Sequence, residues 1–238
     1  MNTENNGDVF PTLQGSVTKP MPGYDLKVMN EHNEECKTGE LGKVVIKLPM
    51  PPAFMTSLWG NDEVFIEKYL TETPGYYTTG DAGVMDSNGY VSIMTRMDDV
   101  INTAGHRIST GRLEEVVNEH SSVVESAVVA FNDEVRGECP LAYVILKGKG
   151  IAEMNEAEIE DLKKVINKKM REDVGAFAKL HGIIFMERLP KTRSGKILRG
   201  TIKSITNDQA YKVPSTIEDM DALDEIAEAA KTFRTNIQ

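Results

Sequence analysis

The chain has 238 residues, and its 27 Lys and Arg against 37 Asp and Glu give a net charge of −10 with histidine neutral. This length suits one or two domains, and 40% hydrophobic with 27% charged residues is an ordinary globular composition that excludes wholesale disorder. No apolar run approaches the ~18 residues of a membrane span, and the acidic balance argues against a nucleic-acid partner.

The first ~95 residues are predicted to be mostly β-structure because apolar residues alternate with polar ones or are β-branched. Strands are expected at 24–29, 41–47, 75–79 and 90–95, and a short helix at 63–70. Asn61 or Asp62 would cap this helix, with Val64, Tyr69 and Leu70 as its apolar members. Asp86-Ser-Asn-Gly89 predicts a turn between the last two strands. The core would be thin, so we expect this part to belong to something larger.

After Asp98 and Asp99 the pattern changes to alternating helices and strands. Helices are expected at 110–120, 155–172 and 219–233, and strands at 123–131, 141–146 and 183–186. The long middle helix is predicted from apolar residues at helical spacing, namely Ile159, Leu162, Val165, Ile166 and Met170. The predicted fold class is α+β, with a β-rich part at 1–97 and a small α+β domain at 98–238, its core at about 114–196.

Two segments near this boundary carry candidate binding residues. The strand Tyr76–Asp81 runs into a Gly-Asp corner, whose carboxylate can accept hydrogen bonds from a diol such as ribose, or can simply turn the chain. In the segment 96–107, Arg96 and Arg107 flank small polar residues and Gly105. Guanidinium groups suit phosphates, and glycine allows a ligand to approach the backbone. A turn with solvated charges is the alternative.

The segment Leu189–Arg199 presents Lys196 just before an expected helix. It is not a P-loop, because Pro190 stands where that motif requires glycine and Ile197 follows the lysine. A lysine at the tip of such a loop can enter an active site as a mobile cation. The alternative is a nucleic-acid patch made by the basic residues between 188 and 203, which the lack of aromatic residues there disfavours.

Single residues give weaker signals. His120 and Arg171 lie at the ends of expected helices, where each can be a favourable partner of the helix dipole. Cys36 and Cys139 are too few for a disulfide scaffold, and no His/Cys/Asp constellation with metal spacing is visible. The polar, acidic start shows neither a signal core nor an Arg-rich presequence. We expect a soluble intracellular protein, in the cytoplasm or the mitochondrial matrix, with no membrane partner.

Taken together, these segments resemble the AMP-forming acyl-CoA synthetases of the ANL superfamily, and most closely the propionate-CoA ligase and short-chain member 3 type. The matching segments are 38–41, 59–62, 74–83, 96–107, 189–196 and 211–219, within a resemblance that covers about residues 15–220. The family's phosphate loop and acyl pocket lie in a large N-terminal domain that this sequence lacks. The resemblance therefore implies the last third of a synthetase: a β-barrel-like subdomain, a hinge and a mobile C-terminal lid domain.

The resemblance also implies a role for each candidate residue. Lys196 matches the catalytic lysine of adenylation, and Asp98 matches the hinge. The nucleotide would be bound by Asp81 and Arg96 at the ribose and by Arg107 at the phosphates. Coenzyme A would meet the backbone of Ala104 and Gly105 with its pantetheine arm, and Arg171 with its nucleotide. His120, with the backbone of Asn118 and Val123, matches a Mg²⁺ position.

The implied reaction has two steps. A short-chain carboxylate, propionate or acetate, reacts with ATP to give acyl-AMP and pyrophosphate, and coenzyme A then displaces AMP. Without the phosphate loop, we expect these 238 residues alone to be inactive. Sequencing the transcript upstream of Met1 would decide whether the chain is part of a catalyst, because a catalyst requires an in-frame phosphate loop there. One alternative is a non-catalytic module that binds nucleotide, coenzyme A or a partner. Another is a carrier-loading adenylation domain, which is disfavoured because the chain has no Gly-Gly dipeptide and so lacks the Gly-Gly-x-Ser carrier attachment motif.

Overall fold

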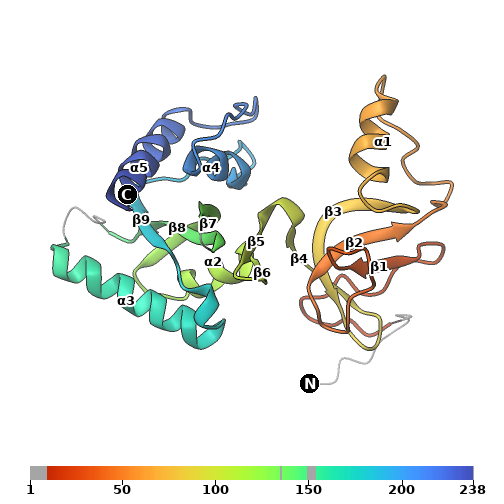
Figure 1. The fold of residues 1–238 in the computed structure, drawn as a ribbon, viewed down its shortest axis with the longest axis horizontal. Helices are drawn as coiled ribbons and strands as arrows, with labels where there is room; N and C mark the ends of the chain where they lie inside the picture. Colours follow the sequence, from red (N-terminus) through yellow and green to blue (C-terminus); the bar gives the residue numbers. More distant parts are fainter. Residues whose placement is uncertain (1–9, 135, 149–153, 238) are drawn as a thin grey trace. The chain divides into compact units, whose positions relative to one another are not determined.

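The computed structural model describes residues 10–134, 136–148 and 154–237, which form two compact units that divide between Asp98 and Asp99 (Figure 1). Each unit has its own sheet and its own core. No helix within these ranges is long and apolar enough to cross a membrane.

The first unit is built on a four-stranded antiparallel sheet in the order β1-β2-β3-β4. Its elements are β1 (Leu26–Met29), β2 (Gly42–Lys47), α1 (Asp62–Leu70), β3 (Tyr76–Met85) and β4 (Val91–Arg96). The predicted turn between β3 and β4 is confirmed, because Asp86 Oδ1 accepts hydrogen bonds from the backbone N–H groups of Asn88 and Tyr90, each at 2.8 Å. The predicted cap of α1 is also confirmed: the Asn61 side chain accepts from the Val64 N–H.

The core of the first unit is small and aromatic. Phe65 and Tyr77 are buried in it, and the Phe54 ring meets the Tyr77 ring edge-on at 4.9 Å between centroids. The predicted apolar face of α1 is wrong in part, because Phe65 is its buried residue whereas Val64 is 39% exposed. Trp59 is fully exposed. This unit therefore leaves large apolar side chains in solvent.

The second unit contains a five-stranded sheet in the order β6-β5-β8-β7, with β9 pairing in parallel with β8. Its strands are β5 (Val100–Thr103), β6 (His106–Ser109), β7 (Val123–Asp133), β8 (Gly137–Leu146) and β9 (Gly182–Met186). The hairpin of β5 and β6 was not predicted from the sequence. Successive residues of β7 and β8 face opposite cores, so both strands are apolar over most of their length.

Helices cover both faces of this second sheet. They are α2 (Thr110–Asn118), α3 (Glu156–Asp173), α4 (Arg199–Thr206) and α5 (Asp221–Ile237), with a short 3₁₀ turn η3 at Ala176–Ala178. Another 3₁₀ turn, η1 at Met97–Asp99, spans the boundary between the two units. The helices α2 and α3 pack into one core, and α4 and α5 pack into the other. The predicted sheet with packed helices is confirmed.

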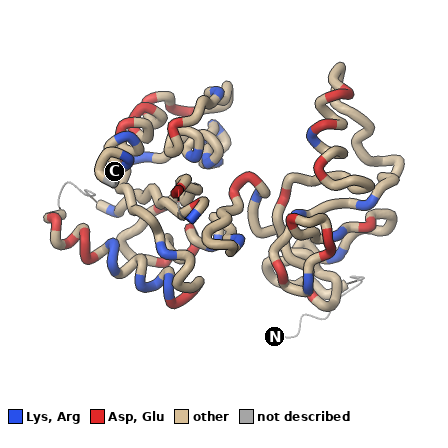
Figure 2. The backbone as a smooth tube through the Cα atoms, viewed as in Figure 1, with Lys and Arg blue, Asp and Glu red and all other residues tan. Residues whose placement is uncertain are grey.

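The helix α3 begins with a capping box. Asn155 Oδ1 accepts from the Glu158 N–H at 3.0 Å, and Glu158 Oε2 accepts from the Asn155 N–H at 2.9 Å. Glu156 and Glu158 lie in its first turn, where negative charge favours the helix dipole, whereas Arg171 in its last turn is followed by the acidic Glu172 and Asp173 (Figure 2). Of its predicted apolar residues, Val165 is 47% exposed and does not belong to the core.

Candidate functional site

In the first unit, Asp81 and Arg96 are direct cross-strand partners on β3 and β4. Arg96 Nη1 lies 3.2 Å from Asp81 Oδ1, and Arg96 Nε lies 3.5 Å from Asp98 Oδ1. The side chains of Asp81 and Arg96 are 35% and 52% exposed. The structure thus brings three predicted residues together, and it leaves a carboxylate and a guanidinium group accessible side by side to a polar ligand.

The pairing of Arg96 with Asp81 depends on Gly80, a residue that was not identified from the sequence. Its φ is +80°, and a Cβ built on it would lie 2.6 Å from Arg96 Nη2. The guanidinium group of Arg96 therefore lies directly over the Gly80 backbone, where it donates to the Thr79 carbonyl at 3.4 Å. Any larger residue at this position must displace Arg96.

We expect Gly80→Ala to destabilise the β3–β4 ribbon by about 1–3 kcal/mol, because alanine is strained at this φ and also collides with Arg96. Gly89→Ala is the matched control: Gly89 has φ +81°, but nothing lies within 4 Å of a Cβ built there. Hydrogen exchange of β3 and β4 peptides in urea measures both losses. A loss at Gly80 no larger than that at Gly89 would contradict an added cost from Arg96 and would show that its guanidinium group, the end of a flexible side chain that is 52% exposed, swings aside freely.

In the second unit, the tip of the β5–β6 hairpin is formed by Ala104 and Gly105, both exposed and both with positive φ, at +49° and +80°. Two successive residues with positive φ are typical of a tight two-residue hairpin turn. The Ala104 N–H donates to the carbonyl of Arg136 at 3.3 Å, and nothing lies within 4 Å of a Cβ built on Gly105. The backbone at Gly105 is therefore open to a ligand. Arg107 lies half-buried on β6, opposite Asn102 on β5.

A basic cavity of about 370 Å³ lies at the end of α3. Its lining residues are Lys164, Asn167, Lys168, Arg171, Ala176 and Lys179. Of these residues, only Arg171 was identified from the sequence. Lys164 and Lys168 could have been found as well, because their spacing from Arg171 places all three on one face of α3. The His106 ring, beside the hairpin tip, stacks on the Phe177 ring at 4.1 Å between centroids. The Ala104–Gly105 tip and one wall of the basic cavity are therefore neighbours.

Lys196 lies on a short hairpin that is held by hydrogen bonds within the hairpin and by hydrogen bonds to one neighbouring segment. The backbone N–H of Thr192 donates to the Lys196 carbonyl at 2.8 Å, and the Lys196 N–H donates to Thr192 Oγ1 at 3.1 Å. A neighbouring segment adds two more backbone bonds, from Arg193 N–H to the Thr216 carbonyl and from Glu218 N–H to the Lys191 carbonyl, each at 2.9 Å. The loop thus has a defined conformation, and the exposed Lys196 side chain directly follows its turn at 192–195.

The basic stretch from 188 to 203 is neutralised from within the second unit. The ion pairs are Arg188 with Asp219 and Glu225, Lys191 with Glu125, Arg199 with Glu114, and Lys203 with Glu138. Arg193 and Lys196 make no ion pair with any described residue. The alternative of a nucleic-acid patch loses its basis, because most of these cations already have acidic partners.

The pair of Glu114 and Arg199 is the most buried of these. The Glu114 side chain is 8% exposed, and its oxygens accept from Arg199 Nε at 2.7 Å and Nη2 at 2.6 Å. Glu114 Oε1 also accepts from the Val128 N–H at 2.9 Å. The hydrogen bond to Glu114 raises the pKa of Arg199. This pair ties α2, β7 and the first residue of α4 together.

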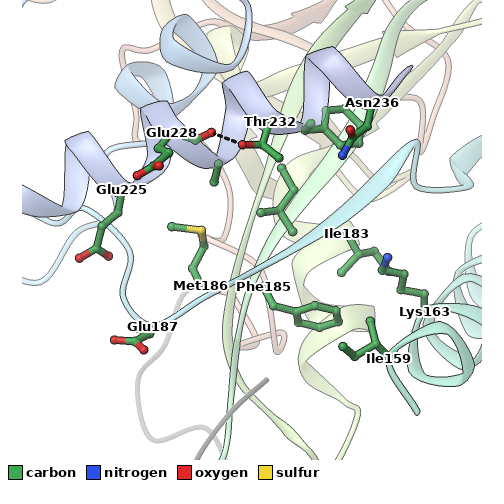
Figure 3. A pocket seen from close by; sticks show the side chains of 13 residues that line it. Ile159, Lys163, Ile183, Phe185, Met186, Glu187, Glu225, Glu228, Thr232 and Asn236 are labelled. Carbon is green, nitrogen blue, oxygen red and sulfur yellow. Dashed lines mark hydrogen bonds between the residues drawn. The ribbon is translucent and has the colours of Figure 1, made fainter. Parts of the chain in front are cut away.

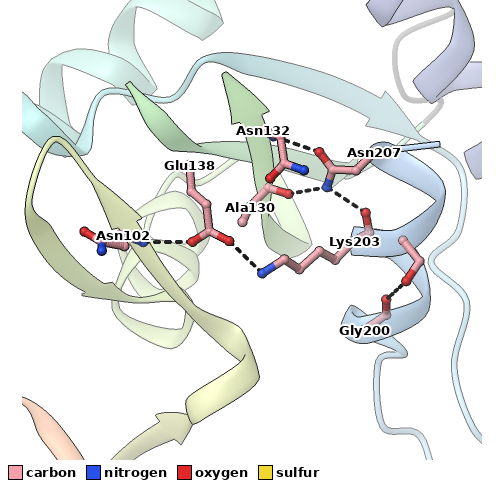
Figure 4. A network of polar contacts seen from close by, with 8 residues as sticks. Asn102, Ala130, Asn132, Glu138, Gly200, Lys203 and Asn207 are labelled. Carbon is pink, nitrogen blue, oxygen red and sulfur yellow. Dashed lines mark hydrogen bonds and ion pairs between the residues drawn. The ribbon is translucent and has the colours of Figure 1, made fainter. Parts of the chain in front are cut away.

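A second polar network fixes the rest of α4 (Figure 4). Lys203 Nζ lies 2.8 Å from Glu138 Oε1, and the other oxygen of Glu138 accepts from the Asn102 N–H at 2.9 Å. The Asn207 side chain donates to the Ala130 carbonyl at 2.8 Å and accepts from the Asn132 N–H at 2.7 Å. The helix that follows Lys196 is therefore attached to β5, β7 and β8.

The predicted Mg²⁺ residues lie at the connection between α2 and β7. Asn118 Oδ1 accepts from Ser126 Oγ at 2.8 Å, the His120 carbonyl accepts from the Val123 N–H at 2.9 Å, and His120 Nδ1 accepts from the Ser122 N–H at 3.3 Å. These three acceptors already have protein donors. In the described ranges, no three His, Cys, Asp or Glu ligand atoms gather at this connection.

One cluster was not visible in the sequence spacing: ligand atoms of Asp133, Cys139 and His181 lie within 4.8 Å of one another.

A larger cavity of about 710 Å³ lies between α3, β9 and α5 and is lined by none of the predicted site residues (Figure 3). Its walls include Ile159, Ile183 and Phe185, and its rim carries Lys163 and several glutamates.

Residues 112–196 match the family described as AMP-binding enzyme C-terminal domain. The chain is 42% identical over 217 residues to the mitochondrial acyl-CoA synthetase short-chain family member 3 of Mus musculus, and 43% identical over 216 residues to the mitochondrial member B of Dictyostelium discoideum. Each match covers 91% of this chain and 31% of the relative. The chain therefore spans about a third of the length of these curated relatives.

Solved structures agree with these sequence matches. The acetoacetyl-CoA synthetase of Streptomyces lividans has a TM-score of 0.76 at 23% identity, over 92% of this chain and 32% of that one, and shows the fold. The anthranilate CoA ligase AuaEII, in complex with anthranoyl-AMP, has a TM-score of 0.65 at 30% identity, over 82% of this chain and 36% of that one. The chain therefore contains an AMP-binding enzyme C-terminal domain at residues 112–196 and is similar, over 91% of its length, to part of the short-chain acyl-CoA synthetases.

Proposed function

We propose that this chain supplies the C-terminal part of an AMP-forming ligase that activates propionate or acetate with ATP and transfers the acyl group to coenzyme A. The observation that carries the proposal is Lys196: an exposed cation without an ion-pair partner among the described residues, on a braced loop, within a basic stretch whose other members are mostly paired. The similarity to short-chain acyl-CoA synthetases supports it.

The first half-reaction brings two anions together, the attacking carboxylate and the α-phosphate of ATP. A cation aimed at the charge that develops between them lowers the barrier, and Lys196 would supply that cation. Asp81 and Arg96 would bind the ribose hydroxyls, and Arg107 would contact a phosphate. Asp98, the last residue of the first unit, would be the hinge about which the second unit moves between the two half-reactions.

The second half-reaction requires coenzyme A, a long and strongly anionic substrate. The open backbone of Ala104 and Gly105 would lie along its pantetheine arm. Arg171, together with Lys164, Lys168 and Lys179 of the basic cavity, would bind its phosphates. The stacking of His106 on Phe177 supports this proposal, because Phe177 directly follows Ala176, a residue of the cavity wall.

Magnesium would accompany ATP, but residues 118–123 fit this ion poorly. Mg²⁺ prefers oxygen ligands that include carboxylates, whereas the predicted set consists of His120 and the backbone of Asn118 and Val123, and the His120 carbonyl already accepts from the Val123 N–H. The proposed reaction therefore assigns no step to Asn118, His120 or Val123.

We also propose an intracellular location, in the cytoplasm or the mitochondrial matrix, since several relatives are mitochondrial by name.

The test is a chimera in which this chain replaces the matching third of the Mus musculus relative. We expect propionate- or acetate-dependent exchange of pyrophosphate into ATP, followed by acyl-CoA formation when coenzyme A is added. Folding is checked by circular dichroism, and ATP and coenzyme A binding by calorimetry. A folded chimera that binds both ligands without turnover would contradict the proposal and favour a non-catalytic module.

A further inference from the structure

Three segments that are distant in sequence meet at one end of the second sheet. Asp133 is the last residue of β7, Cys139 lies on β8, and His181 directly precedes β9. A carboxylate oxygen, the thiol sulfur and an imidazole nitrogen lie within 4.8 Å of one another. Cys139 is 2% exposed, and the other two residues are partly buried. The three side chains therefore converge at the edge of the core, where solvent can still reach Asp133 and His181.

The surrounding structure holds these side chains in place. Phe131 pairs with Cys139 across β7 and β8, and Asp133 shares the face of Phe131 because side chains alternate along a strand. The His181 ring stacks on the Phe131 ring at 5.2 Å between centroids and 17° between planes. Its backbone N–H donates to the Pro140 carbonyl at 2.7 Å. The imidazole therefore has a fixed orientation that does not depend on a ligand.

We propose that Asp133, Cys139 and His181 bind a divalent transition-metal ion, with Zn²⁺ as the best fit, and that water completes a four-coordinate site. Thiolate, imidazole and carboxylate are zinc ligands, and tetrahedral bond lengths would separate the ligand atoms by about 3.3–3.7 Å. Side-chain adjustments on the order of 1 Å achieve this geometry. A thiolate and an imidazole do not suit Mg²⁺, so this site is separate from the magnesium that accompanies ATP.

Binding must displace two partners of the Cys139 thiol. Burial and the Asp133 charge raise the pKa of Cys139, while hydrogen bonds to Thr103 and Arg136 act in the opposite direction. On binding, the thiol proton would pass to solvent and the sulfur would bond to the metal. Arg136 is exposed, so its guanidinium group can turn away into solvent. Its positive charge nonetheless opposes a dication, and its removal should strengthen binding.

The experiment is a titration of the full 238-residue chain with Co²⁺, followed by thiolate-to-metal charge-transfer and d–d absorption, with Zn²⁺ then added as competitor. We expect one equivalent of Co²⁺ to give the thiolate band and tetrahedral d–d bands, and Zn²⁺ to abolish both. Arg136→Ala should tighten Co²⁺ binding several-fold. Hydrogen exchange of the segments around 139 and 181 should slow when Zn²⁺ is added.

The chain offers matched controls for each ligand. Cys36→Ser removes the other cysteine and should leave the spectrum unchanged, whereas Cys139→Ser should abolish the thiolate band. His181→Phe preserves an aromatic ring on Phe131 but removes the nitrogen ligand, so it should weaken binding at least ten-fold without unfolding the chain. A folded wild-type chain with no thiolate band, or a band that survives Cys139→Ser, would overturn the proposal.

Discussion

In the synthetase chimera, Lys196→Ala is expected to slow acyl-adenylate formation by on the order of 10²–10³-fold, the typical cost of removing one well-placed electrostatic group from an active site. Thioester formation from supplied propionyl-AMP should be spared, because no carboxylate attacks phosphorus in that step. Acetylation of Lys196 should act in the same way, since it removes the charge. Both half-reactions are timed on the same preparation.

Arg193→Ala is the matched control for this variant. Arg193 is the other exposed cation of the basic stretch that makes no ion pair with a described residue, and its loss should change adenylation less than three-fold. Equal losses in both half-reactions of Lys196→Ala would indicate a misfolded second unit. An unchanged adenylation rate would remove Lys196 from the mechanism.

Glu114→Ala is expected to destabilise the second unit by about 3–5 kcal/mol, because it leaves the guanidinium group of Arg199 partly buried without its counter-charge. It also removes the acceptor of the Val128 N–H in the middle of β7. Hydrogen exchange of β7 peptides as a function of urea measures the free energy of unfolding of this unit alone. Replacing both residues by methionine should cost much less than Glu114→Ala, since no charge then remains buried.

Glu125→Ala provides the comparison for this prediction. Glu125 pairs with Lys191 at 2.7 Å, but the two side chains are 28% and 31% exposed. Solvent screens such a pair, so its loss should cost less than about 1 kcal/mol. If Glu114→Ala costs no more than Glu125→Ala, burial does not distinguish the two pairs and the argument for Glu114 fails.

The strands and helices with strong local patterns were predictable from the sequence. The strands β7 and β8 are long apolar runs, and α3 has both a helical period and a capping residue. The β5–β6 hairpin was missed because its strands are short and its turn uses Ala104, which is not a typical residue at positive φ. The buried face of α1 was misassigned because tertiary packing against Tyr77 selects Phe65, and a short helix offers too few apolar residues to define a stripe.

The candidate site divides in a similar way. Asp81, Arg96 and Lys196 belong to contiguous motifs, so a local reading could identify them. The acid partners of the basic stretch could not be identified, because Glu114 lies 85 residues from Arg199 and Glu138 lies 65 residues from Lys203. Such pairing depends on which strand lies next to which helix. The same reason concealed the cluster of Asp133, Cys139 and His181, whose members come from three separate segments.

The bracing of the Lys196 hairpin has a consequence for the speed at which its charge can be relocated. A free surface loop samples its conformations within nanoseconds to microseconds, whereas the collective motion of a packed domain takes microseconds to milliseconds. Because the hairpin is bonded to the 214–218 segment and continues into the anchored α4, its backbone has little independent freedom. A large displacement of this backbone therefore requires movement of the whole second unit against the friction of the solvent, so solvent viscosity should limit its rate.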